Sequence, residues 1–174
     1  YKPAAFKNVT NGIAYRRWLL GANPGLCKLL DQTIGTEYKH DAAALSKLNA
    51  YAGNRTVLNE LNRIKLANKE EFANYLSKST GQVIDPASIF DCQVKRMHEY
   101  KRQHLNALNI AAQYNEIKHN PNHNIQPTTF IFGAKAAPGY YMAKQIIKFI
   151  CSLGQMIEND PQARDILKIV YLED

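Results

Sequence analysis

Cysteine is scarce in this sequence, and long hydrophobic runs are absent. Its 174 residues include only Cys27, Cys92 and Cys151, an odd number without close spacing, which argues against a disulfide framework. Because Cys92 and Cys151 fall in apolar stretches, we expect buried free thiols in a reducing cytoplasm. No window reaches the length of a transmembrane helix, and the opening Tyr1-Lys2-Pro3 is not typical of a signal peptide. We therefore expect a soluble, cytoplasmic protein with no membrane partner.

The sequence also lacks an initiating methionine, internal repeats and low-complexity segments. It stops at Asp174, directly after an apolar, strand-like stretch. We therefore expect an excerpt of a longer protein. With 45% hydrophobic residues it is long enough to bury a core, as one domain or a large part of one.

Positive charge is in excess. The 22 Lys and Arg residues against 15 Asp and Glu give a net charge of +7, which suits phosphorylated small molecules, nucleic acid or acidic lipid. Residues 95–102 read Lys-Arg-Met-His-Glu-Tyr-Lys-Arg and supply +3 of this charge, four cations less Glu99. The remaining charge is scattered, as on an ordinary solvated surface.

The hydrophobic pattern predicts an α/β fold, a partial doubly wound parallel sheet preceded by a helical segment. Residues 1–81 are mainly helical, with helices expected at 16–20, 24–34, 41–50 and 54–79. Residues 82–174 form an incomplete βαβαβ unit. Its strands are expected at 88–94, 128–132 and 166–172, and its helices at 100–118 and 139–153, with a second helical stretch to 157.

The expected helix 100–118 carries an apolar stripe that we assign to the core. Leu105, Leu108 and Ala112 recur at helical spacing. The stripe is widened by three further residues, Ile110, Tyr114 and Ile117.

The basic cluster lies at the joint between a strand and a helix. In one continuous helix, Arg96 and Lys101 would point about 140° apart and could not share a ligand. A strand-to-helix loop over residues 95–99 lets these side chains converge with helix N–H groups on one anion. We favour the loop, because open α/β sheets bind ligands at the carboxyl ends of their strands. The alternative is a set of solvated surface cations.

A second joint, residues 132–141, has the same topology. Gly133, Ala134 and Gly139 let backbone approach a ligand closely, and a helix N-terminus follows. It matches neither G-x-G-x-x-G nor a Walker loop, and the alternative is a joint that only turns the chain.

Several long motifs in register resemble the glycogen and maltodextrin phosphorylases over nearly the whole chain. They are Thr10-Asn11-Gly12-Ile13, Arg16-Arg17-Trp18-Leu19, Asn23-Pro24-Gly25-Leu26, Phe90-Asp91, Lys95 to Gln103, Gly133 to Lys144, Asn159-Asp160-Pro161 and Leu172-Glu173-Asp174. The resemblance places the chain in the first half of the C-terminal, nucleotide-fold domain of such a two-domain enzyme, with residues 1–81 at the domain junction.

The resemblance implies phosphorolysis of an alpha-1,4-glucan by inorganic phosphate, giving glucose 1-phosphate with retention, in a cytoplasmic homodimer that uses pyridoxal 5'-phosphate and no metal. It assigns Lys95 to the cofactor's phosphate, and Arg96 and Lys101, as catalytic residues, to the substrate phosphate. It assigns Asn11 and Tyr100 to glucose hydroxyls. Tyr140 would form an aromatic wall near the site entrance, and His98 would support the site.

Each assignment has a structural alternative. His98 would be a capping or packed histidine, Tyr100 and Tyr140 packing residues, and Asn11 a turn residue before Gly12. For the whole chain, one alternative is a module that binds nucleic acid or another polyanion, although no strand platform interleaved with aromatics is visible. Another is a glycosyltransferase of the same architecture with a nucleotide-sugar donor.

The sequence also departs from the family pattern. Tyr15 stands where Pro is common, and Ala134 and Tyr141 stand where animal members usually have Gly and His. These forms look more like bacterial maltodextrin-type enzymes, which argues against animal-style allosteric control. The family's cofactor lysine lies in a Gly-Thr-Gly-Asn-Met-Lys segment that this sequence does not contain. We therefore expect the 174-residue chain to be inactive by itself.

Overall fold

The computed structural model describes Lys7 and residues 12–173. The chain divides into two compact units, Tyr1–Asn68 and Lys69–Asp174, and the boundary lies inside the long helix α2 (Arg55–Thr80). The sequence placed the change of organisation at residue 81. The structural division comes earlier because the last turns of α2 pack against the sheet of the second unit, where Leu76 is fully buried.

The first unit is helical, as expected from its sequence. It contains a π-helical turn at Arg17–Gly21, helix α1 at Pro24–Thr33, 3-10 helices at Glu37–Lys39 and Ala42–Tyr51, and the start of α2. Asn23 caps α1 by accepting a hydrogen bond from the backbone N–H of Leu26 at 3.1 Å, with Pro24 in the first turn. The helix expected over 41–50 is present at Ala42–Tyr51, but in the tighter 3-10 form. Asp41 caps it by accepting a hydrogen bond from the backbone N–H of Ala43.

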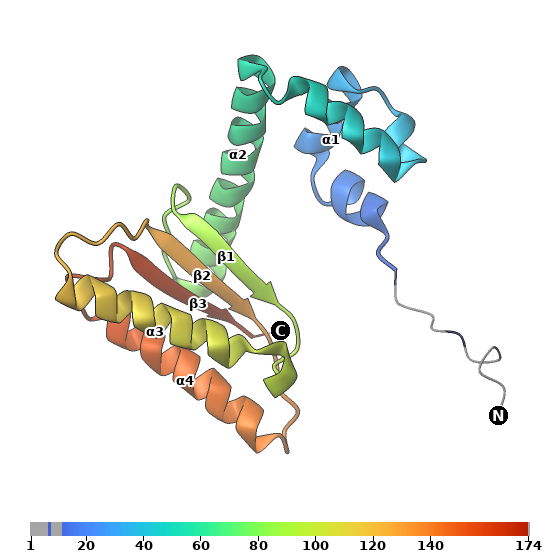
Figure 1. The fold of residues 1–174 in the computed structure, drawn as a ribbon. Helices are drawn as coiled ribbons and strands as arrows, with labels where there is room; N and C mark the ends of the chain where they lie inside the picture. The colour runs from blue at the N-terminus through green and yellow to red at the C-terminus, as the bar shows by residue number, and fades with distance from the viewer. Residues whose placement is uncertain (1–6, 8–11, 174) are drawn as a thin grey trace. The chain divides into compact units, whose positions relative to one another are not determined.

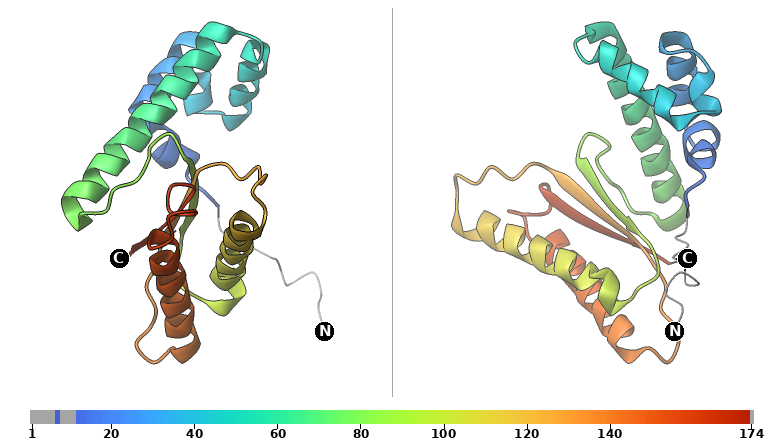
Figure 2. Two further views of the ribbon diagram at one scale, coloured as in Figure 1. Left: turned by 90° about the vertical axis from the view of Figure 1, so that its left-hand side faces the viewer. Right: turned by 45° about the vertical axis from the view of Figure 1, so that its right-hand side comes forward.

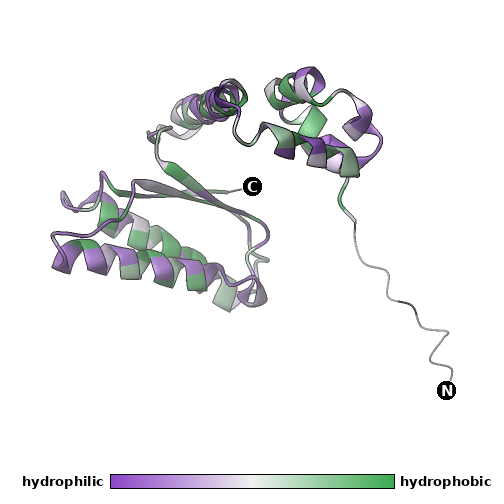
Figure 3. Ribbon diagram, turned by 45° about the horizontal axis from the view of Figure 1, so that its top comes forward, coloured by the Kyte–Doolittle hydropathy of each residue, from purple (hydrophilic) through white to green (hydrophobic). Residues whose placement is uncertain are grey.

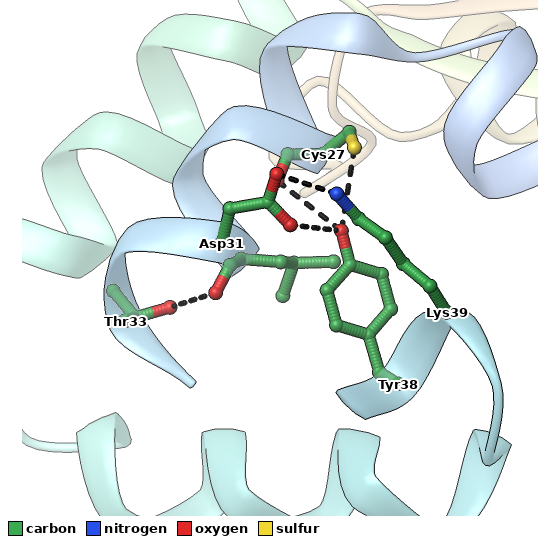
Figure 4. A network of polar contacts seen from close by, with 6 residues as sticks. Cys27, Asp31, Thr33, Tyr38 and Lys39 are labelled. Atoms are coloured by element: carbon green, nitrogen blue, oxygen red, sulfur yellow. Dashed lines mark hydrogen bonds and ion pairs between the residues drawn. The ribbon is translucent and has the colours of Figure 1, made fainter. Parts of the chain in front are cut away.

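A polar network around Tyr38 holds this unit together (Figure 4). Tyr38 is fully buried, and its hydroxyl donates to Asp31 Oδ1 at 2.9 Å and lies 3.3 Å from the Cys27 sulfur. Lys39 Nζ lies 2.7 Å from the other Asp31 oxygen and lowers the pKa of that carboxyl. Burial, together with these polar neighbours, raises the pKa of Tyr38, so the phenol stays protonated and acts as a donor.

The second unit is built on a parallel three-stranded sheet in the order β1-β2-β3 (Figure 1). The strands are β1 (Ile89–Val94), β2 (Thr128–Gly133) and β3 (Leu167–Leu172), and Ile89 pairs with Thr128, which pairs in turn with Leu167. Helix α3 (Gln103–His119) connects β1 to β2, and α4 (Tyr141–Glu158) connects β2 to β3. The expected α/β fold with a parallel sheet is confirmed.

Helices cover both faces of this sheet (Figures 1 and 2). On one face α3 and α4 enclose the larger core, which includes Ile110, Phe130, Phe132 and Ile150. On the other face the last turns of α2 bury Leu76 against the strands. Hydrophobic and hydrophilic residues alternate along α3 and α4, as Figure 3 shows. Within Lys7 and residues 12–173, no helix is long and apolar enough to cross a membrane.

The position of α3 differs from the sequence prediction. The helix begins at Gln103, because Arg102 adopts a left-handed conformation with φ 62° and separates α3 from a 3-10 turn at Glu99–Lys101. The expected stripe was partly wrong: Ile110 and Ile117 are buried, whereas Leu105 and Leu108 are exposed. The two-sided apolar pattern of this helix allowed the inner face to be misassigned.

Two further expectations are corrected. Helix α4 is continuous from Tyr141 to Glu158, so no break follows Leu153. The three cysteines are free thiols, but Cys92 and Cys151 are exposed and Cys27 is half-buried. Cys92 lies on an edge strand, where an apolar sequence neighbourhood does not ensure burial.

Candidate functional site

The candidate site lies at the carboxyl ends of the parallel strands. A pocket of about 360 Å³ opens there between the last residues of β1, β2 and β3 and the joints that follow them. It is lined by Val94, Lys95, Arg96, Gly133, Ala134, Lys135, Leu172 and Glu173. Both joints selected from the sequence therefore contribute to one hollow at the ligand-binding edge of an α/β sheet.

The chain after β1 is an extended loop, as predicted, and not the start of a helix. Its backbone continues the pairing of the strands: Lys95 N–H donates to the Gly133 carbonyl at 3.0 Å, and Met97 N–H donates to the Lys135 carbonyl at 3.1 Å. Met97 is buried in the larger core of the second unit and so anchors the loop to the fold. The residues on either side of it, Arg96 and His98, are exposed.

Small residues bring the two joints together. A Cβ on Gly133 would lie 3.3 Å from the Val94 side chain, so glycine permits the close approach of the strand ends. Ala134 beside it is buried. These positions match the sequence expectation that small residues in the second joint let backbone come close.

The turn after the loop is set by Arg102 and Gln103. The 3-10 turn Glu99–Lys101 ends at the left-handed Arg102, and α3 then starts with Gln103, which is fully buried. Gln103 Nε2 donates to the Arg96 carbonyl at 3.0 Å and so holds the loop to the first turn of α3. Sequence reasoning missed Gln103, and its only signal was a polar residue in a core-facing position.

The cations of the cluster divide between two hollows. Lys95 lines the pocket at the strand ends and also a second hollow of about 480 Å³ beside β1. Of these two hollows, Arg96 lines the first and Lys101 the second. Lys95 is therefore the cation that connects them. The convergence of the Arg96 and Lys101 side chains on one ligand, which the loop predicted, is not seen in this structure, because Lys101 lies past the loop on the turn beside β1.

These cations are not neutralised by neighbours. Among the described residues, the side chains of Lys95, Arg96 and Lys101 form no ion pair with a carboxylate. Lys101 Nζ lies 5.7 Å from the centre of the Tyr100 ring, a cation–π contact that leaves its hydrogen-bond donors available. Uncommitted donors of this kind bind anions.

His98, Tyr100 and Tyr140 form one aromatic group above the loop. The His98 ring centre lies 4.4 Å from that of Tyr100 and 5.1 Å from that of Tyr140. Tyr100 is exposed, and His98 Nδ1 accepts a long hydrogen bond of 3.4 Å from the Tyr100 backbone N–H. The structure thus brings together three of the residues selected from the sequence.

Glu99 completes this group and was missed by sequence reasoning. The Tyr140 hydroxyl donates to Glu99 Oε2 at 2.6 Å, and the Glu99 backbone N–H donates to the same hydroxyl at 3.3 Å. The hydrogen bond to the Glu99 carboxylate raises the pKa of Tyr140. A single acidic residue inside a run of cations was the signal that could have identified it.

Asn11, the remaining predicted site residue, lies outside the described residues. Within the described part of the chain, no group of three or more His, Cys, Asp or Glu side chains is placed to hold a metal ion. The described site therefore offers cations, hydroxyls and amides, which bind and orient a phosphorylated or hydroxyl-rich ligand.

Comparison with known proteins agrees with this chemistry. The sequence profile of the carbohydrate phosphorylases matches residues 1–174. The chain is 48% identical over 173 residues to the liver form of glycogen phosphorylase from Ovis aries, covering 99% of the chain and 20% of that protein. It is 45% identical over 172 residues to glycogen phosphorylase from Bacillus subtilis (strain 168), covering 99% and 22% respectively.

Glycogen phosphorylase from Chlamydia pneumoniae is 44% identical over 170 residues, covering 98% of the chain and 21% of that protein. The chain thus spans about a fifth of the length of the curated relatives it matches. Identities of 44% to 48% do not separate the animal proteins from the bacterial ones, so they give no support to a closer bacterial relationship. The match over all 174 residues shows that the chain belongs to the carbohydrate phosphorylase family.

Proposed function

We propose that this chain is part of an alpha-1,4-glucan phosphorylase, in the first half of its C-terminal domain. The enzyme transfers the terminal glucose of glycogen or maltodextrin to inorganic phosphate and releases glucose 1-phosphate. The observation that carries this proposal is a set of three cations, Lys95, Arg96 and Lys101, at the carboxyl end of the sheet in a chain of this family, none of which has a carboxylate partner among the described residues.

The residues present fit the phosphate group of pyridoxal 5'-phosphate, the cofactor that the family implies. Lys95 has no ion pair among the described residues, and it lines both hollows, where an anion would gain charge-assisted hydrogen bonds. We assign Lys95 to the cofactor's phosphate. When bound, the cofactor supplies that phosphate group as an acid–base partner for the substrate phosphate.

Arg96 and Lys101 hold the substrate phosphate in this proposal, each reaching it from the hollow that it lines, on either side of Lys95. Two phosphates in contact repel each other, so a site for both requires several fixed cations. A hydrogen bond to a charged group contributes about 1.5–3 kcal/mol, so these side chains would offset part of that repulsion and favour binding of orthophosphate. Within residues 12–173 neither side chain has a carboxylate partner, which supports this role.

The transferred glucose is held by hydroxyl contacts. We assign Tyr100 and Asn11 to its hydroxyls, because Tyr100 presents an exposed phenol next to Lys101. Tyr140 forms the aromatic wall of the entrance, and His98 supports it through the ring contact at 5.1 Å.

Catalysis in this proposal is positioning and electrostatic stabilisation. Breaking the glycosidic bond generates positive charge on the sugar, and a phosphate held by Arg96 and Lys101 offers the complementary negative charge. The same phosphate donates a proton to the leaving glucan oxygen and then attacks the anomeric carbon. Retention of configuration follows because the nucleophile and the leaving group share one face of the sugar.

The test is phosphorolysis by the full-length protein that carries this chain, and its family implies a cytoplasmic homodimer. With maltodextrin and orthophosphate it should release alpha-glucose 1-phosphate, and omission of orthophosphate should stop the release. Free glucose as the main product, or saturable use of uridine or adenosine diphosphate glucose, would contradict the proposal. So would salt-sensitive RNA binding that neither phosphate nor glucose 1-phosphate affects.

We further propose that the 174-residue chain is inactive by itself, because it lacks the Gly-Thr-Gly-Asn-Met-Lys segment. Incubated with pyridoxal phosphate, glucan and orthophosphate, it should form no glucose 1-phosphate above the background of a double variant, Arg96→Ala with Lys101→Ala. Turnover above that control would refute this part of the proposal.

A further inference from the structure

One acidic side chain sits inside the basic cluster. Glu99 lies between His98 and Tyr100 in sequence, in the turn that leads to Lys101. A carboxylate beside an anion site weakens anion binding by repulsion. Its presence there calls for a contribution that outweighs this cost.

The contacts of Glu99 connect the two joints. Its carboxylate accepts a 2.6 Å hydrogen bond from Tyr140, and its backbone N–H donates to the same hydroxyl at 3.3 Å. Tyr140 belongs to the joint after β2, whereas Glu99 belongs to the joint after β1, 41 residues earlier. A phenol held by both the side chain and the backbone of one residue fixes that residue in position and orientation.

This connection lies in the turn between the two cations Arg96 and Lys101. The backbone of Arg96 is held by the hydrogen bond from the Gln103 side-chain amide, and the next residue, Met97, is buried in the core. Lys101 is the last residue of a 3-10 turn whose side-chain cap is the long contact with His98. The backbone hydrogen bond from Met97 to the Lys135 carbonyl joins the loop to the second joint just before this turn. Within the turn, the shortest described contact with the second joint is the 2.6 Å hydrogen bond from Tyr140 to Glu99, and the contact of Tyr140 with His98 Nδ1 is longer, at 3.5 Å.

We propose that Glu99 is a positioning residue that, with Tyr140, clamps the basic loop in the conformation that binds orthophosphate. The clamp deepens the proposed function and rests on it for the identity of the anion. Glu99 does not touch the substrate in this account. It acts through the loop that carries Arg96 and Lys101.

The two possible roles of Glu99 predict opposite changes in orthophosphate affinity when the residue is replaced, which makes the inference testable. If Glu99 acted only by its charge, Glu99→Ala and Glu99→Gln would both strengthen orthophosphate binding. If it positions the loop, Glu99→Ala weakens binding about tenfold, and Glu99→Gln, which keeps a hydrogen-bond acceptor, weakens it less. Tyr140→Phe removes the other end of the clamp without a change of charge and should weaken binding as Glu99→Ala does.

The experiment measures the dissociation constant of orthophosphate by calorimetry in the full-length protein, and then its KM and kcat in phosphorolysis. We expect the KM for orthophosphate to rise about tenfold in Glu99→Ala and Tyr140→Phe while kcat falls less than about threefold. The double variant should be no worse than either single variant, because both remove one interaction. Glu116→Gln on the exposed side of α3 and Tyr141→Phe are the matched controls and should leave binding unchanged.

Amide hydrogen exchange provides a second readout that needs no turnover. In Tyr140→Phe, the amides of residues 98–101 should exchange at least tenfold faster, and in Tyr141→Phe they should not change. Tighter or unchanged orthophosphate binding in Glu99→Ala would overturn the inference, as would unchanged exchange in Tyr140→Phe. If the unsubstituted protein forms no glucose 1-phosphate, the proposed function fails. The orthophosphate-binding and hydrogen-exchange results would still show whether Glu99 and Tyr140 hold the loop in position.

Discussion

The side chain of Gln103 is hydrogen-bonded to the backbone of Arg96, with 3.0 Å between Nε2 and the carbonyl oxygen. Gln103 is fully buried at the first position of α3, and Arg96 lies on the exposed loop after β1. The position of a surface cation is thus set by a residue in the core. We therefore expect affinity for an anion and stability of the fold to be coupled through this contact.

Replacing Gln103 should therefore change both properties. Gln103→Met keeps the approximate volume but leaves the Arg96 carbonyl without its partner, at an expected cost of about 1–3 kcal/mol in the free energy of unfolding. Urea denaturation measures this loss, and a parallel titration should show weaker orthophosphate binding. Gln145→Met, at an exposed position of α4, is the matched control. Equal effects of the two variants would contradict the coupling.

The two faces of α3 give a second prediction. Ile110→Ala should lower the free energy of unfolding by about 2–5 kcal/mol, because Ile110 is fully buried against the sheet and its loss leaves a cavity. Leu108→Ala removes a side chain that is 54% exposed and should cost far less. Thermal or urea unfolding separates the two. A larger loss for Leu108 would restore the stripe that the sequence first indicated.

The sequence predicted an element correctly where its hydrophobic pattern was compatible with only one secondary structure and one buried face. Strand β2 has a short apolar run, Phe130 to Phe132, after two β-branched threonines, and its position was predicted to within one residue. Helix α3 has apolar residues on two sides, so periodicity alone could not say whether Leu105 or Ile110 faces the core. The break at Arg102 was not predictable, because a non-glycine residue with a positive φ depends on contacts made after folding.

The ion pair between Lys118 and Asp160 predicts how the stability of the fold depends on pH. Asp160 lies 2.8 Å from Lys118 Nζ and accepts a hydrogen bond from the Tyr114 hydroxyl at 2.7 Å, and these contacts, the one with Lys118 foremost, lower the pKa of Asp160 to about 2. Since the folded pKa is below the unfolded value, the stabilisation is fully present above the unfolded pKa and is lost as pH falls toward 2.

The melting temperatures of the protein and of Asp160→Asn should therefore differ near neutral pH. Below about pH 4, the typical range of an unfolded aspartate, the two curves should converge. The measurement is thermal unfolding in a series of buffers across this range. A constant difference down to the acid limit would show that Asp160 acts by some means other than its charge.

The candidate site was predictable in its cations but not in its supports. Lys95 and Arg96 stand out because cations gather at a strand-to-helix joint, and the structure places both at the strand ends. Glu99 and Gln103 could not be identified, because their partners lie 41 and 7 residues away and are defined only by the folded chain. Nor could the sequence show that Arg96 and Lys101 line separate hollows.

The most direct test of the account is the dependence of phosphorolysis on orthophosphate in the full-length protein. Arg96→Ala and Lys101→Ala should each raise the KM for orthophosphate, or lower kcat/KM, by about thirtyfold, the equivalent of about 2 kcal/mol for one charge-assisted hydrogen bond. Lys148→Ala, an exposed cation on α4, should change neither value, and all three variants should keep the melting temperature. A KM for orthophosphate that stays within twofold in Arg96→Ala and Lys101→Ala would contradict the assignment of the basic cluster to the substrate phosphate.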